Sequence, residues 1–134
     1  MFWQPQEVAE ILRMIEQEHL DIRAVTMGIS LRGLACDDLN AFCGRVRDHL
    51  QRTAERLVPT IEAIRQDLAV PITNKRMSVT PMALVAESTA AESYVPVARA
   101  MDEAAAAVGV DYIGGFSALV EKGIRYQKTT EAKG

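Results

Sequence analysis

Hydrophobic residues recur along the chain at two spacings, and segments with one spacing alternate with segments of the other. A spacing of three or four positions, typical of one face of a helix, occurs in four segments: 5–19, 39–68, 81–90 and 93–108. Short segments rich in β-branched and apolar residues, typical of strands, lie at 22–31, 75–80 and 110–114. A last helix is expected from Phe116 to Lys122. Strands separated by helices pair in parallel, so the pattern predicts an α/β fold with helical crossovers.

Prolines affect two of the predicted helices: Pro59 interrupts one, and Pro81 opens the other. The segment from Leu39 to Leu68 keeps one helical phase and is interrupted only by Pro59. A straight helix of that length would measure ~45 Å, whereas a folded chain of this size has a diameter of about 36 Å. We therefore expect a kink at Pro59 and a helix that projects past the domain. Thr80 is predicted to cap the helix that Pro81 opens.

Length and composition favour a single soluble domain at residues 1–126 with a polar tail at 127–134. The net charge of −3 is spread along the chain and leaves no basic patch for a nucleic acid. No apolar run approaches the ~20 residues that would cross a membrane. Cys36 and Cys43 are too few for a disulfide framework, so we expect a cytoplasmic protein. No metal site or cofactor is expected.

Three segments carry a resemblance to a known family. They are Asp21–Leu31 (DIRAVTMGISL), Pro71–Pro81 (PITNKRMSVTP) and Val108–Val120 (VGVDYIGGFSALV), with Tyr94-Val95-Pro96 between the last two. In order and spacing they resemble the bacterial and archaeal family called domain of unknown function 711. The resemblance covers roughly residues 5–123.

The resemblance implies a partial barrel. The family's fold is similar to the ten-stranded α/β barrel of pyruvate formate-lyase-like glycyl radical enzymes, and this chain corresponds to about the N-terminal third. Three strands cannot close such a barrel, and a parallel sheet with open edges needs cover. We therefore expect a homo-oligomer, or a second polypeptide that completes the barrel. The resemblance names no reaction, and we expect no radical chemistry from this chain by itself.

The carboxyl ends of the three predicted strands are the first candidate site. Parallel strands bring these ends to one edge of the sheet, where α/β proteins bind ligands. Backbone N–H groups at a glycine turn and the start of a helix favour an anion, such as a carboxylate or phosphate metabolite. The candidate binding residues are Ser30, Thr80, Gly114, Gly115, Phe116 and Ser117. The alternative is that the glycine pair is only a tight turn.

A second candidate is one face of the middle strand. Strand periodicity places Arg76, Ser78 and Thr80 on one face and Lys75, Met77 and Val79 on the other. The first strand alternates similarly at Thr26 and Ser30. In a barrel the polar face would line a cavity, and the alternative is a solvated face. Lys75, Arg76, Ser78 and Cys36 are candidate binding residues of lower rank. For the two cations the reason is that a strand at 75–80 places them far from its carboxyl end.

Other reactive side chains have weaker patterns. Cys36 precedes a helix start that could activate a thiol, but Asp37 and Asp38 oppose a thiolate. His19 and His49 have no zinc-ligand spacing to either cysteine. The catalytic residues, if there are any, stay unassigned.

Two classes of function therefore remain open. The first is a small α/β subunit, or truncated form, of a barrel protein that contributes to a small-anion site in an oligomer. The second is a non-catalytic interaction or regulatory module. The measured mass of the purified chain and its co-purification with a second chain would discriminate between them.

Overall fold

The computed structural model describes residues 2–89 and 91–117. Helices and strands alternate along the chain, as the hydrophobic pattern predicts. The elements in chain order are α1 (Pro5–Glu16), β1 (Ile22–Ile29), α2 (Leu39–Ala54), α3 (Leu57–Leu68), β2 (Ile72–Val79), α4 (Met82–Val85), a short 3₁₀ helix (Ala86–Ser88), α5 (Val95–Val108) and β3 (Tyr112–Gly114).

The three strands form one parallel sheet in the order β1-β2-β3. This result confirms the predicted α/β class, its parallel pairing and its helical crossovers, and the arrangement is compatible with a segment of an α/β barrel. β2 begins at Ile72, three residues before the predicted start, because the apolar and polar residues from Ile72 onward already pair with β1. β1 and β3 lie within their predicted segments.

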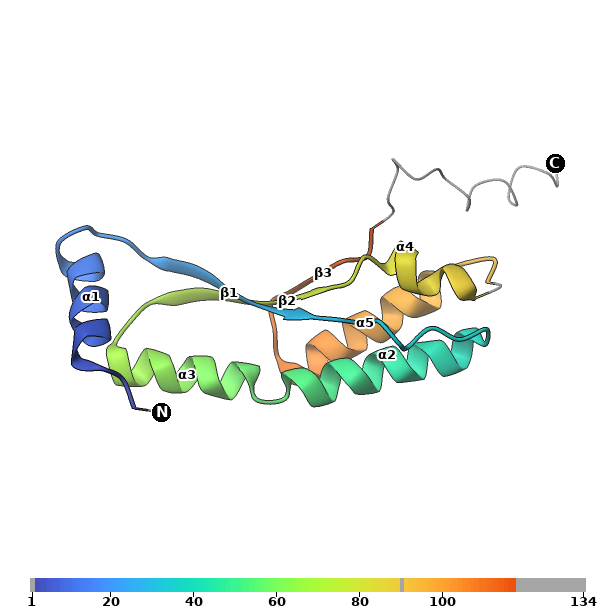
Figure 1. The fold of residues 1–134 in the computed structure, drawn as a ribbon, viewed down its shortest axis with the longest axis horizontal. Helices are drawn as coiled ribbons and strands as arrows, with labels where there is room; N and C mark the ends of the chain where they lie inside the picture. Colours follow the sequence, from blue (N-terminus) through green and yellow to red (C-terminus); the bar gives the residue numbers. More distant parts are fainter. Residues whose placement is uncertain (1, 90, 118–134) are drawn as a thin grey trace.

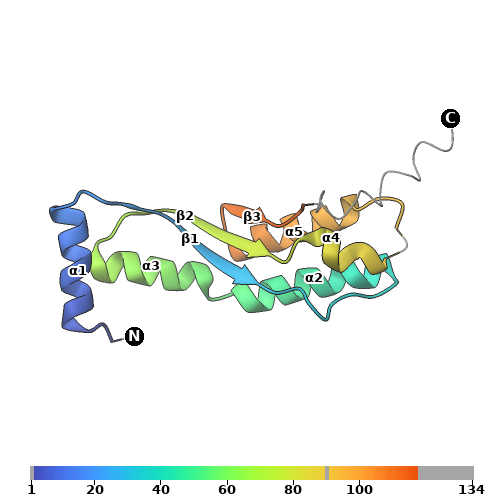
Figure 2. The same ribbon diagram turned by 45° about the horizontal axis from the view of Figure 1, so that its top comes forward.

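Helices cover one face of the sheet. In Figure 1, α2, α3 and α5 lie beneath the strands, whereas α1 and α4 lie near the two ends of the sheet. Figure 2 shows the same two-layer arrangement after rotation. Met77, Val79 and Ile29 point into the helix layer and are buried. The main hydrophobic core therefore lies between the sheet and the α2–α5 pair, with Phe42, Leu50 and Val97 fully buried in it.

A second, smaller core lies where β1 and β2 begin. Ile61 of α3 packs there with Val70 and Ile72, and α1 contributes Ile11 and Ile15 to the same cluster. The far part of the predicted long helix is therefore not free. α3 packs on the beginning of the sheet and projects together with it.

The predicted 39–68 helix is two helices. α2 ends at Ala54 and α3 begins at Leu57, so the break precedes Pro59 by several residues rather than falling on it. A proline ring clashes with the carbonyl group four residues before it, which here belongs to Glu55. Pro59 itself lies in the first turn of α3, where its missing N–H removes no helical hydrogen bond.

The helix after β2 starts differently from the prediction. Pro81 is the N-cap of α4, and Thr80 does not cap this helix. Two carbonyl groups that follow β3 take over the capping: the N–H groups of Met82 and Ala83 donate to the oxygens of Gly115 and Ser117, at 2.8 and 3.3 Å. α5 runs from Val95 to Val108, and Gly109 follows it as the C-cap in the left-handed conformation, which glycine adopts easily.

Two further predictions concern the end of the chain. Phe116 and Ser117 are not helical, so the predicted last helix does not begin at Phe116. The rest of that helix and the polar tail lie outside the described residues.

Candidate functional site

The face of the sheet opposite the helices is polar and solvent-exposed. Side chains alternate between the two faces of a strand, and the parallel register aligns residues of the three strands in rows. One row is Thr26, Arg76 and Tyr112, and the next is Gly28, Ser78 and Gly114. We call these six residues, together with Ser30 and Thr80 at the strand ends, the open face. The predicted separation of Arg76 and Ser78 from Met77 and Val79 is confirmed.

Arg76 and Tyr112 form the distinctive pair on the open face. The Arg76 guanidinium carbon lies 5.8 Å from the centre of the Tyr112 ring, within the range of a cation–π interaction. The ring folds across Gly114, since a Cβ atom at Gly114 would lie 3.3 Å from the Tyr112 Cε1 atom. Arg76 makes no ion pair with any residue that the structure describes. It is also the only charged residue of the open face.

The strand start corrects the low rank of Arg76. A strand at 75–80 would place this arginine at its beginning, but β2 starts at Ile72 and Arg76 lies in its middle. Ser78 and Gly114 are one row away, toward the carboxyl ends of the strands. Arg76 is therefore central to the open face rather than remote from it.

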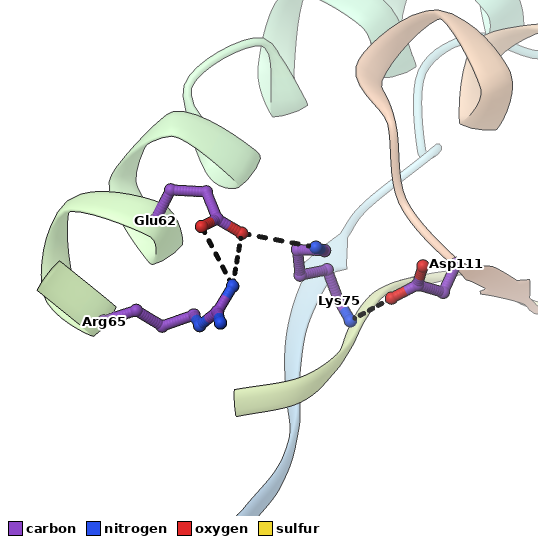
Figure 3. A network of polar contacts seen from close by, with 4 residues as sticks. All are labelled: Glu62, Arg65, Lys75 and Asp111. Atoms are coloured by element: carbon purple, nitrogen blue, oxygen red, sulfur yellow. Dashed lines mark hydrogen bonds and ion pairs between the residues drawn. The ribbon is translucent and has the colours of Figure 1, made fainter. Parts of the chain in front are cut away.

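Lys75 lies on the other face. Its ammonium group pairs with Glu62 of α3 at 3.4 Å, and Glu62 also pairs with Arg65 at 3.0 Å (Figure 3). The Lys75 side chain is only 20% exposed. Lys75 thus ties β2 to α3 and is not a candidate ligand-binding residue of the open face.

The carboxyl ends of β1 and β2 meet, as predicted. The Thr80 hydroxyl oxygen accepts a hydrogen bond from the Leu31 N–H at 3.0 Å, and the Thr80 N–H donates to Ile29 at 3.3 Å. The Ser30 hydroxyl accepts from the Arg32 N–H at 3.3 Å, and the Ser30 carbonyl lies 3.1 Å from His49 Nε2. Among the described residues, neither hydroxyl donates a hydrogen bond, so each still has a donor hydrogen available.

We expect Thr80→Val to destabilise the chain by about 1–2 kcal/mol, because the N–H of the fully buried Leu31 loses its acceptor. Denaturant unfolding measures this loss. Thr80→Ser, which keeps the hydroxyl, and Thr26→Val on the exposed part of β1 are the controls. A Thr80→Val variant as stable as these two would show that the hydrogen bond contributes little.

Gly115 has a structural reason to be glycine. Its φ is +116°, and a Cβ atom there would lie 2.7 Å from the Val79 carbonyl oxygen and closer still to Val79 Cγ2. Its carbonyl oxygen accepts from the N–H groups of Met82 and Ser117. These contacts support the alternative reading, in which the glycine turn joins β2, β3 and α4. The helix start that was expected to bind an anion at Phe116 is not there, because Phe116 and Ser117 are not helical.

In the part of the chain that the structure describes, no basic side chain is hydrogen-bonded to Cys36 or Cys43. The Cys36 thiol lies 3.4 Å from the Asp38 carbonyl oxygen. Burial raises the pKa of the Cys43 thiol, so this group stays protonated at neutral pH. Cys36 and Cys43 are both half-buried and pack against the main core. Asp38 caps α2 through its carboxylate, which accepts from the N–H groups of Asn40 and Ala41.

Other classes of site find no support in residues 2–89 and 91–117. These residues contain no group of three or more histidine, cysteine, aspartate or glutamate side chains placed to hold a metal ion. Within the same residues, none of the helices has both the length and the apolar character needed to span a bilayer. Two open hollows, of about 450 and 560 Å³, are lined by helix residues and their flanking loops, not by the open face.

Sequence reasoning missed Tyr112 and Gly28 as members of the candidate site. Gly28 lies on the same face of its strand as Thr26 and Ser30, and Tyr112 on the same face as Gly114. The alternation of side chains along each strand could have identified both residues. The row that joins them depends on the register between strands, which the sequence pattern does not determine.

The fold and the open face define the chain as a one-sided α/β unit, a parallel sheet with helices on one face and polar residues on the other. The chain belongs to the family described as Uncharacterised ACR (DUF711), whose model matches residues 13–133. This match confirms the resemblance of the three sequence segments.

Individual proteins with similar sequences carry the name UPF0210 protein. The chain is 53% identical to a UPF0210 protein of Pelobacter propionicus over 124 residues, which are 92% of this chain and 27% of the relative. A UPF0210 protein of Ruminiclostridium cellulolyticum is 54% identical, with 89% of this chain and 26% of the relative covered. A third, of Methanococcoides burtonii, is 48% identical over 92% of this chain. The chain thus spans about a quarter of the length of the curated relatives it matches.

Proposed function

We propose that the open face binds a small anion, a carboxylate or a phosphate, through the guanidinium group of Arg76. The observation that carries this proposal is the position of Arg76: a cation without a carboxylate partner among the described residues, in the middle of an exposed polar sheet face. The chain has a net charge of −3, so diffuse charge does not attract anions. The attraction for an anion would therefore have to come from the charge of Arg76 itself.

The neighbours of Arg76 suit such a ligand. A guanidinium that lies over an aromatic ring, as that of Arg76 does over Tyr112, can still present its N–H groups to a ligand. The planar edge of these N–H groups matches a carboxylate or phosphate. Ser78, one row away, and Thr26, in the same row, add hydroxyl donors. Gly28 has no atom within 4 Å of the place a Cβ would take, which leaves room for a ligand close to the backbone.

We further propose that the open face lines a cavity in a larger assembly. The relatives are about three and a half times as long as this chain. Among the described residues, the sheet exposes a polar face, and β1 and β3 each have an outer edge without a paired strand. A second polypeptide, or further copies of this chain, would cover these edges. In that assembly the chain would contribute one wall of the anion site.

We expect Arg76→Gln to weaken the binding of inorganic phosphate or acetate at least about tenfold, because a charge-assisted hydrogen bond is lost. NMR titration of the isotope-labelled chain at constant ionic strength measures the affinity. It also shows whether the shifted signals belong to the rows of Arg76 and Ser78.

The matched control is Arg45→Gln, at an exposed arginine of α2. This variant is expected to bind phosphate as the unaltered chain does. If Arg76→Gln and Arg45→Gln bind alike, or if no signal of the open face shifts at millimolar anion, the proposal is wrong.

A further inference from the structure

β3 is the shortest strand and the one that carries Tyr112. It consists of Tyr112, Ile113 and Gly114, and its one pairing among the described strands is with Arg76–Ser78 of β2. A strand of three residues has few hydrogen bonds of its own with which to hold its register. The contact between Tyr112 and Arg76 therefore needs support from outside the strand.

Asp111 provides that support immediately before β3. Its carboxylate Oδ2 accepts the N–H of Lys75 at 2.8 Å, and its own N–H donates to the carbonyl oxygen of Lys75, also at 2.8 Å. One residue thus satisfies both backbone groups of Lys75, on the side of β2 that faces β3. Figure 3 shows the carboxylate of Asp111 directed at the Lys75 backbone nitrogen.

We call the two hydrogen bonds between Asp111 and Lys75 the clamp. The position of the clamp along β2 determines where Tyr112 lies. Lys75 precedes Arg76, and Asp111 precedes Tyr112, so fastening the first pair aligns the second. The Lys75 side chain is itself held on α3 by Glu62. The clamp consequently connects β3 to the helix layer through β2.

We infer that Asp111 is a positioning residue of the open face: its carboxylate, which accepts the Lys75 N–H beside the backbone hydrogen bond, holds Tyr112 against the Arg76 guanidinium. The effect of Asp111 on anion affinity rests on the proposed function, in which Arg76 binds the anion. A guanidinium held against a ring loses less freedom on binding, which favours affinity.

Two variants of Asp111 test the geometry. Asp111→Ala should abolish the upfield ring-current shifts that the Tyr112 ring gives the Arg76 side-chain protons, while the methyl signals of the main core keep their positions. Asp111→Asn should retain these shifts, because its amide oxygen can accept the same N–H. Unchanged shifts in Asp111→Ala would overturn the inference, as would their loss in Asp111→Asn.

Phosphate titration tests the consequence for binding. Asp111→Ala should weaken phosphate binding about threefold, the size expected for an exposed cation–π contact. In a Tyr112→Leu background the same change should have no further effect, because Asp111 acts through Tyr112. An equal loss in both backgrounds would overturn the inference. If the unaltered chain binds no phosphate, the proposed function fails, and the ring-current shifts still decide the role of Asp111.

Discussion

Gly115→Ala is expected to destabilise the chain by about 3 kcal/mol or more, because a side chain there meets the backbone of β2. The added Cβ would lie 2.7 Å from the Val79 carbonyl oxygen, and the backbone φ of +116° is itself unfavourable for alanine. To accept the methyl group, the end of β3 would have to move away from β2. That movement would also disturb the hydrogen bond from Met82 to Gly115. Denaturant unfolding followed by circular dichroism measures the loss.

Gly33→Ala is the matched control for this prediction. Gly33 also has a positive φ, +84°, but no atom lies within 4 Å of the place of its Cβ. It should lose only about 1 kcal/mol, the cost of the backbone conformation. The difference between the two variants isolates the steric contact with Val79. Equal losses would show that Gly115 is needed for its φ alone.

Larger residues at position 115 would alter both the structure of the turn and any ligand binding nearby. A valine at position 115 would change the packing of β3 on β2, and any loss of binding would follow from that change. Arg76 and Arg45 are better probes, since both side chains are exposed.

Phe42→Ala is expected to cost about 3–5 kcal/mol, the range for removing a buried phenylalanine side chain. Phe42 lies in the first turns of α2, has no exposed surface and packs in the main core. The relevant measurement is the free energy of unfolding in urea or guanidinium chloride. A loss of this size would leave the isolated chain with little stability, since small domains have only about 5–15 kcal/mol in total.

Phe116→Ala removes the same atoms at a position that is 52% exposed. Its effect should stay within about 0.5 kcal/mol. A Phe42→Ala loss as small as that of Phe116→Ala would contradict the placement of α2 against the sheet.

The sequence pattern determined the order and type of the elements. The helical stripe of α5, the glycine that ends it and the alternation along β2 are local features, and local spacing is sufficient to identify them. The parity of β2 also indicated that Arg76 and Ser78 lie on the face opposite to Met77. The family resemblance was carried by residues of β1, β2 and β3 with their flanking segments, and the family match confirms it.

The tertiary structure alone decided which residues share the open face. Arg76 meets Tyr112, and Gly28 aligns with Gly114, because the strands pair in one particular register. The clamp of Asp111 on Lys75 joins residues 36 positions apart. Val79 leaves no space for a side chain at Gly115, although the helices between β2 and β3 separate the two residues in the sequence. Periodicity reports how each residue is oriented on its own element, whereas these contacts depend on how separate elements pack together, and no local pattern encodes that packing.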